Sequence, residues 1–317
     1  MKAVYLKQNQ LTLQELPRPE LQEYQALIRV RMAGICNTDL ELVKGYMGFE
    51  GVPGHEFVGV VEEAPDANWV QKRVCGEINF GCGACEACRK GLSRHCPNRT
   101  VLGILNQNGA FAEYVALPVE NLHAVPDALP DEAAVFVEPV AAALEILEQV
   151  QIEPAQRVAV VGDGKLGLLI AQVLRLTGCE LSLVGKHRRK LALAESWGIS
   201  THLADALPEV RHDLVVEASG SPSGFETALR LLRPRGTLVL KSTYHRRLDL
   251  DAAPIVIDEI QIVGSRCGPF APAVRLLAQR LVQVEPLVEQ VYPFDQVLKA
   301  FEHAAQPETL KVLVKFG

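Results

Sequence analysis

The fold of the second half of this 317-residue chain is decided by one stretch, Arg157-Val-Ala-Val-Val161 followed by Gly162-Asp163-Gly164-Lys165-Leu166-Gly167. The first part reads as a buried strand, and the second matches G-x-G-x-x-G at the start of an amphipathic helix over about 165–177. The first glycine permits a tight turn, the second lets the backbone approach a pyrophosphate, and the third lets helix and strand pack closely. The helix N-terminus offers N–H groups to phosphates.

The stretch therefore predicts a dinucleotide-binding loop, with a turn of purely structural glycines as the alternative. Its expected contact residues are Gly162, Gly164, Lys165, Leu166 and Gly167.

Strands and helices alternate on both sides of this loop. Apolar strands are predicted over 157–161, 180–184, 213–217, 236–240 and 260–263, and helices over 140–150, 190–197 and 224–232. Alternation of this kind predicts a parallel sheet covered by helices on both faces. The pattern thus indicates a doubly wound α/β domain over residues 141–267.

The first 140 residues have a different pattern. Short strand-like runs such as 26–32 and 57–62 are separated by turns with glycine and proline, for example Pro53-Gly54. This spacing predicts a mainly β domain.

The segment 268–317 carries two predicted helices, over 272–282 and 294–304, and a closing strand over 311–316. It contains too little apolar sequence to fold alone. We therefore expect it to return to the N-terminal part, so that 1–140 and 268–317 form one domain, with the α/β domain between them in the sequence.

Composition excludes several classes of protein. Hydrophobic residues make up 48% and charged residues 22%, and the formal net charge is −6. The acidic balance argues against nucleic-acid binding, and no apolar run reaches the roughly 18 residues of a membrane span. Lys7 interrupts the position of a secretory signal core. We expect a cytoplasmic protein with its eight cysteines in a reducing compartment.

The second strand of the α/β domain bears on which dinucleotide is bound. An NAD site usually carries an acid at the end of this strand, about 20 residues after the first glycine. Here the strand continues as Gly185-Lys186-His187-Arg188-Arg189-Lys190, with no acid. A 2′-phosphate favours such cations. The loop of Gly185, Lys186, His187 and Arg188 therefore favours NADP(H) over NAD(H), although a solvated basic helix start would look the same.

Four of the cysteines are clustered as Cys82-x₂-Cys85-x₂-Cys88-x₇-Cys96. Four thiolates at this spacing can enclose a tetrahedral Zn²⁺ with no open position, which is typical of a structural site. An iron–sulfur cluster is the alternative from the residues alone.

Three further segments carry metal-binding residue types, each weakly indicative by itself. They are Gly34-Ile-Cys36-Asn-Thr38-Asp39, Gly54-His55-Glu56 and Val137-Glu138-Pro139. Cys36 and His55 could equally be buried core residues. Glu138, however, follows the apolar run Ala133-Ala-Val-Phe-Val137, and an acid there needs a partner.

Together these motifs, in this order over the whole chain, resemble the zinc-dependent medium-chain dehydrogenase/reductase superfamily of alcohol and polyol dehydrogenases. The resemblance implies a catalytic zinc held by Cys36, His55 and Glu138, with Glu56 as a neighbouring or exchanging ligand. Which glutamate ligates in the resting state stays open. It also implies a GroES-like catalytic domain beside the Rossmann domain, and an active site in the cleft between them.

The resemblance assigns further roles. Thr38 matches the hydroxyl that relays the alcohol proton, Asp39 matches an acid that orients the histidine, and Lys311 matches a cation near the cofactor pyrophosphate. Two positions depart from the common pattern. Glu41 stands where a histidine often ends the proton relay, and Asn37 replaces a more usual glycine or arginine. The relay could end at Glu41 or pass to ribose and water.

The expected protein is a zinc-dependent oxidoreductase that transfers hydride between NADP⁺ and a polyol, sugar or other secondary alcohol. It is expected to bind two zinc ions per chain and to form a homodimer or homotetramer. The alternatives are a reductase acting on an aldehyde or ketone at the same site, and a non-catalytic NADPH-binding protein.

Overall fold

The computed structural model describes residues 1–243, 248 and 250–317. The chain forms two compact units, one of Met1–Glu138 with Phe270–Gly317 and one of Pro139–Pro269. Within the described residues, no helix is long and apolar enough to cross a membrane.

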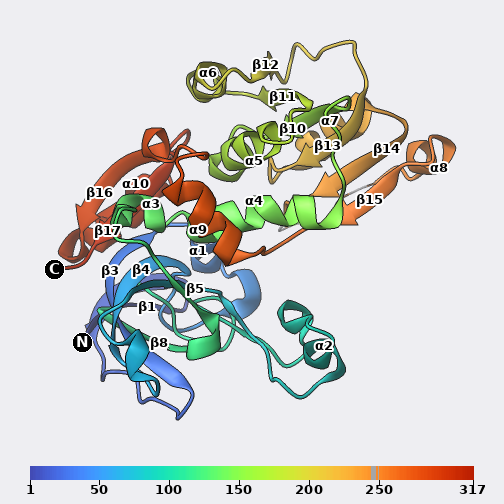
Figure 1. Cartoon of the computed structure of the whole chain (residues 1–317). Helices are drawn as coiled ribbons and strands as arrows, with labels where there is room; N and C mark the ends of the chain where they lie inside the picture. Colours follow the sequence, from blue (N-terminus) through green and yellow to red (C-terminus); the bar gives the residue numbers. More distant parts are fainter. Residues whose placement is uncertain (244–247, 249) are drawn as a thin grey trace. The chain divides into compact units, whose positions relative to one another are not determined.

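The unit Pro139–Pro269 is built on a six-stranded parallel sheet with the order β12-β11-β10-β13-β14-β15 (Figure 1). Its strands are β10 (Arg157–Val161), β11 (Glu180–Gly185), β12 (Ser200–Leu203), β13 (His212–Glu217), β14 (Leu232–Leu240) and β15 (Gln261–Gly264). This is the order of a doubly wound dinucleotide-binding sheet, in which the strand of the glycine loop lies at the centre. The predicted fold class of this part is confirmed.

Helices cover this sheet because their apolar faces pack on strands that are apolar throughout. The covering helices are α4 (Val137–Gln149), α5 (Lys165–Arg175), α6 (Arg188–Ser196) and α7 (Pro222–Leu231), whereas the short α8 (Ala253–Ile257) buries none of its residues. Phe225 of α7 is buried in a core with Val161, Val184 and Val215 from three adjacent strands. That core holds the carboxyl ends of β10, β11 and β13 together, next to the glycine loop.

The other unit contains a seven-stranded sheet ordered β16-β17-β3-β4-β5-β9, with β8 also paired to β3. These strands are β3 (Gln25–Gly34), β4 (Glu56–Glu63), β5 (Arg73–Gly76), β8 (Tyr114–Pro118), β9 (Leu122–Ala124), β16 (Val288–Pro293) and β17 (Lys311–Lys315). β17 pairs antiparallel with β3, so the end of the chain lies beside the N-terminal strands.

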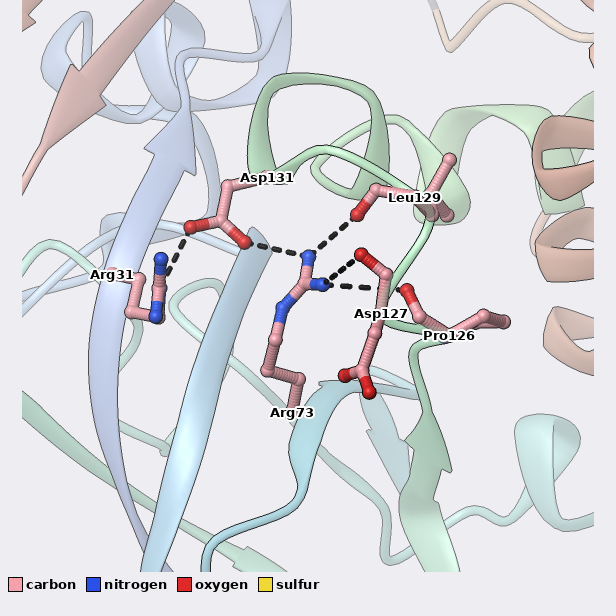
Figure 2. Close-up of polar contacts among 6 residues, drawn as sticks. All are labelled: Arg31, Arg73, Pro126, Asp127, Leu129 and Asp131. Carbon is pink, nitrogen blue, oxygen red and sulfur yellow. Dashed lines mark hydrogen bonds and ion pairs between the residues drawn. The ribbon is translucent and has the colours of Figure 1, made fainter.

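Small elements complete this unit. They are β1 (Lys2–Lys7), β2 (Gln10–Glu15), β6 (Asn79–Phe80), β7 (Thr100–Val101), α1 (Asn37–Val43), α2 (Glu86–Arg89), α3 (Asp131–Ala134), α9 (Phe270–Ala278) and α10 (Val297–Ala304). Figure 2 shows Asp131, at the start of α3, between an arginine of β3 and an arginine of β5: its carboxylate accepts from Arg31 and from Arg73, each at 2.7 Å. Arg73 also donates to the carbonyl of Leu129 at 2.7 Å, which ties the segment before α3 to β5.

Two predicted helices of the C-terminal segment differ in their bounds. The helix expected over 272–282 ends at Ala278, because Arg280 adopts a φ of +57°, outside the right-handed helical region. The helix expected over 294–304 begins with a 3₁₀ turn, Phe294–Gln296, before α10.

Candidate metal centres and dinucleotide loop

The four clustered cysteines lie together in space. α2 begins after Cys85, whose sulfur accepts from the backbone N–H of Cys88 at 3.4 Å, and the Cys82 N–H donates to the sulfur of Cys96 at 3.4 Å. The sulfurs of Cys85 and Cys96 are 3.7 Å apart, and all four lie within 4.8 Å of one another. Gly83 and Gly91, with φ of +70° and +75°, make the turns that let so short a segment fold back on itself.

The acidities of these thiols differ although they are neighbours. N–H groups of Ala84 and Cys85 lower the pKa of the Cys82 thiol to about 6, whereas burial and the adjacent Cys85 raise the pKa of Cys88 to about 11. Like charges this close oppose one another, so the four sulfurs need a cation if all are to be thiolates. The arrangement is suited to one small tetrahedral cation.

A second group of metal-binding residue types consists of Cys36, His55 and Glu56, whose ligand atoms lie within 4.8 Å of one another. Cys36 caps the N-terminus of α1, and His55 and Glu56 stand at the start of β4. Gly54 turns the chain into β4 with a φ of +102°, and a Cβ there would lie 2.7 Å from the ring of Phe111. The chain therefore needs a glycine at this point to bring His55 to Cys36.

Asp39 organises this group although it is not one of the three. Its carboxylate is fully buried and accepts from the backbone N–H groups of Cys36 at 2.8 Å and Gly54 at 3.2 Å. The same carboxylate lies 3.4 Å from Nδ1 of His55. Burial opposes protonation of His55, but Asp39 and Cys36 outweigh it and raise the pKa of the imidazole well above its usual value. The geometry suits a carboxylate that orients a ligand histidine.

Lys311 approaches the same group from β17. Its ammonium is buried and pairs with the carboxylate of Glu56, and it lies 3.5 Å from the carbonyl oxygen of Ile35. Burial lowers the pKa of Lys311, but Glu56, Cys36 and Glu138 outweigh this and raise it. Lys311 thus lies at the candidate metal group, and its predicted contact with a cofactor pyrophosphate stays a prediction.

The remaining residues of the predicted catalytic site have other partners. Thr38 Oγ1 is 3.7 Å from the Cys36 sulfur. Glu41 pairs with Lys44 at 2.8 Å. Glu138, half-buried in the first turn of α4, is not one of the mutually close ligands among the described residues. Its predicted ligation stays a prediction.

The glycine loop after β10 has the geometry that its sequence predicts. Gly162 has a φ of +124°, and a Cβ on it would lie 2.7 Å from the backbone of Ala218. A Cβ on Gly167 would lie 1.8 Å from the carbonyl oxygen of Gly162, so helix α5 approaches the turn closely. Gly164 precedes α5 and has no heavy atom within 4 Å of the place of a Cβ, which leaves the backbone there open to a ligand.

One residue of this loop was missed as a functional candidate. The carboxylate of Asp163, the second residue of the motif, accepts from the backbone N–H groups of Lys186 at 2.8 Å and His187 at 2.7 Å. The loop after β11 has no acid of its own, but the carboxylate of Asp163 from the loop after β10 lies against it. The contact spans more than 20 residues and depends on the parallel pairing of β10 and β11, so no local pattern could reveal it.

Comparisons with known proteins agree over the whole length of the chain. Residues 22–127 match the family described as alcohol dehydrogenase GroES-like domain, and residues 166–281 match the family described as zinc-binding dehydrogenase. D-arabitol-phosphate dehydrogenase of Enterococcus avium is 30% identical, over 97% of this chain and 94% of its own length.

Solved structures give the same result. An alcohol dehydrogenase of Escherichia coli in complex with NADH has a TM-score of 0.92 at 26% identity, covering 100% of this chain and 99% of that one. A zinc-binding dehydrogenase of Sinorhizobium meliloti bound to NADP has a TM-score of 0.91 at 27% identity, covering 99% and 98%. The chain, with its GroES-like and Rossmann folds, therefore belongs to the zinc-dependent medium-chain dehydrogenase/reductase superfamily and is an oxidoreductase of the alcohol dehydrogenase type.

Proposed function

We propose that this protein is a zinc-dependent, NADP(H)-preferring dehydrogenase that oxidises a secondary alcohol of the polyol or sugar class. The buried group of Cys36, His55 and Glu56 carries the proposal, because a thiol, an imidazole and a carboxylate within 4.8 Å of one another form a donor set that suits catalytic zinc. The substrate class is supported by the relative that acts on D-arabitol phosphate. Glu138, in a Glu-Pro-Val-Ala sequence similar to the polyol branch, adds to that support.

In the proposed site Cys36 and His55 hold the zinc, with Glu138 or Glu56 as the third ligand. Asp39 fixes the ring of His55 through its contact at Nδ1. Lys311 compensates the charge of Glu56, which weakens Glu56 as a permanent ligand and favours its exchange with Glu138.

When bound, zinc supplies a Lewis acid that polarises the oxygen of the alcohol or carbonyl substrate. Thr38, whose hydroxyl lies 3.7 Å from the Cys36 sulfur, takes the alcohol proton in this proposal. Glu41, whose carboxylate pairs with Lys44 at 2.8 Å, is the next acceptor in this proposal. A bound nicotinamide cofactor would supply the hydride acceptor.

A second, structural zinc is proposed at the four cysteines. A tetrahedral zinc with Zn–S bonds of about 2.3 Å places its sulfurs about 3.8 Å apart, close to the 3.7 Å between Cys85 and Cys96. An iron–sulfur cluster contains several irons and needs more widely spaced sulfurs, so the spacing favours zinc. Thiols that bind zinc must stay reduced, which agrees with the cytoplasmic location that we propose.

The cofactor site is proposed at the loops after β10 and β11. The open backbone at Gly164, with Lys165 and Leu166 beginning α5, would receive the pyrophosphate. Lys186 and Arg188 are exposed beside it, and both favour a 2′-phosphate.

The two compact units, Met1–Glu138 with Phe270–Gly317 and Pro139–Pro269, support a catalytic domain of 1–140 with 268–317 and a Rossmann domain of 141–267 inserted in its sequence. We also propose a homodimer or homotetramer, because β15 is an edge strand and Val256 and Ile257 of the adjoining α8 segment are 74% and 76% exposed.

The test is an assay of zinc-replete protein with NADP⁺ against sugars, polyols and secondary alcohols, together with metal analysis. We expect turnover and about two zinc ions per chain. Cys36→Ser should abolish turnover and leave about one zinc, whereas Cys88→Ser should lose the other zinc. Turnover only of aldehydes or ketones with NADPH would favour the reductase. Zinc at the four cysteines alone, without turnover, would contradict the proposal and favour a non-catalytic binder.

A further inference from the structure

Asp163 occupies an unusual place in the α/β unit. It follows the first glycine of the loop after β10, yet its buried side chain faces the loop after the neighbouring strand β11. One carboxylate oxygen, Oδ2, accepts from the N–H groups of Lys186 and His187 and lies 3.0 Å from Nδ1 of the His187 ring. The other oxygen, Oδ1, lies 3.2 Å from the same ring nitrogen.

The carboxylate fills the space where a side chain on Gly185 would be. A Cβ at Gly185 would lie 2.5 Å from Cβ of Asp163 and 2.6 Å from its Oδ2. Gly185 ends β11, where an NAD site usually carries its ribose-binding acid. In this chain the acid is therefore supplied from the adjacent strand, and the strand end itself must stay a glycine.

The hydrogen bonds of Asp163 show what this acid does. An ionised carboxylate can only accept, so the ring contact is a hydrogen bond in the form of His187 that carries a proton on Nδ1. Two backbone N–H groups and one ring N–H surround the carboxylate, so its hydrogen bonds are made to groups of the protein itself. The last residue of this loop that Asp163 binds is His187, which directly precedes Arg188, the first residue of α6.

We propose that Asp163 is a positioning residue that sets the preference for NADP(H) by fixing the loop of Gly185, Lys186, His187 and Arg188. By holding two successive amides and the His187 ring, it presents the exposed side chains of Lys186 and Arg188 to the ribose 2′-phosphate. The inference rests on the proposed dehydrogenase function, since it concerns how that enzyme discriminates between its cofactors.

A direct contact of Asp163 with the ribose is the competing role, and it predicts the opposite change in cofactor preference for Asp163→Asn. If its carboxylate met the ribose directly, it would accept from the 2′-hydroxyl of NAD and repel the 2′-phosphate of NADP. Asp163→Asn would then weaken NAD binding and strengthen NADP binding. As a positioning residue, Asp163 should show the reverse, because an amide cannot accept from both backbone N–H groups and the ring without facing one donor with its own NH₂.

The experiment is a calorimetric titration of wild type and Asp163→Asn with 2′,5′-ADP and 5′-AMP, with kcat/KM for NADP⁺ and NAD⁺ measured alongside. We expect the preference for the 2′-phosphate to fall about tenfold in the variant, from loss of a charge-assisted network. Asp163→Ser is a second variant in case the first folds poorly.

Asp213→Asn is the matched control. Asp213 also accepts a backbone N–H, from Arg157 at 2.7 Å, but at the start of β10 and β13, the opposite end of the sheet. It should leave the preference unchanged. An unchanged or increased preference in Asp163→Asn would overturn the inference. Failure of the proposed function would be separate, because wild-type protein would then turn over no alcohol with either cofactor.

Discussion

Asp163 and Gly185 form a complementary pair, in which the acid on one strand requires the absence of a side chain on the next. Their relation follows from the parallel register of β10 and β11, which pairs Val161 with Val184 and so brings the two strand ends together. A substitution at either position must therefore be judged with the other.

Moving the acid back to the strand end should reverse the cofactor preference. In Asp163→Gly with Gly185→Asp, the Asp163 atoms that would lie 2.5–2.7 Å from the new Cβ are removed, and the new carboxylate should accept from the ribose 2′-hydroxyl and repel a 2′-phosphate. We expect the ratio of kcat/KM for NADP⁺ over NAD⁺ to fall about tenfold or more.

Gly185→Asp alone is the control for steric overlap with Asp163. Its Cβ would lie 2.5 Å from that of Asp163, so this variant should lose about 1–3 kcal/mol of stability by overpacking. Chemical denaturation measures that loss. A double variant that folds and keeps the wild-type preference would show that the strand end does not read the ribose.

Much of the element order can be read from the sequence because each signal is local. The strand at 157–161 is observed with the predicted bounds, and the four cysteines that approach one another lie within one short segment. β12 was missed because Ser200–Leu203 is polar and only partly buried, and β16 because its burial does not alternate. Asp163 and the pairing of Glu56 with Lys311 depend on strand neighbours that no local pattern shows.

Asp131 connects three elements and should matter for the stability of the β-rich unit. It accepts from Arg31 on β3 and from Arg73 on β5, and it begins α3 (Figure 2). The side chain of Arg73 is only 15% exposed, and Asp131 is its one carboxylate partner among the residues that the structure describes. Asp131→Ala therefore leaves a largely buried guanidinium with fewer acceptors, and we expect a loss of about 2–4 kcal/mol in the free energy of unfolding.

Urea denaturation with matched m-values would measure this loss. Asp127→Asn is the control, because Asp127 contributes only its backbone carbonyl to Arg73 and its exposed side chain points away in Figure 2. That variant should unfold within about 0.5 kcal/mol of wild type. A stable Asp131→Ala would mean that the carbonyl of Leu129 and its neighbours suffice to hold Arg73.

At the scale of the whole molecule, the two candidate metal groups and the nucleotide loops are divided between the compact units. The cysteine group and the group around His55 lie in the unit that contains both chain ends, whereas Gly162, Asp163 and Gly185 lie in Pro139–Pro269. Substitutions in the nucleotide loops should therefore change cofactor binding without changing zinc content, which separates the two halves of the proposed activity experimentally.

The proposed association of copies gives a prediction for the intact protein. β15 is the last strand of the six-stranded sheet, and Val256 and Ile257 beside it are 74% and 76% exposed. A strand edge with no partner strand among the described residues, next to exposed apolar side chains, favours pairing with a second copy. Light scattering should give a mass of at least twice the 34.7 kDa of one chain.

Val256→Asp with Ile257→Asp should reduce that mass toward a single chain, because two carboxylates would lose their hydration in an apolar interface. Leu13→Asp is the control: Leu13 on β2 is 39% exposed, an apolar residue of the other unit, and its variant should keep the wild-type mass. A monomeric wild type, or an unchanged mass in the double variant, would place the association elsewhere or exclude it. Because the sheet edge belongs to the nucleotide-binding unit, loss of association should lower the melting temperature of the protein but change its zinc content little.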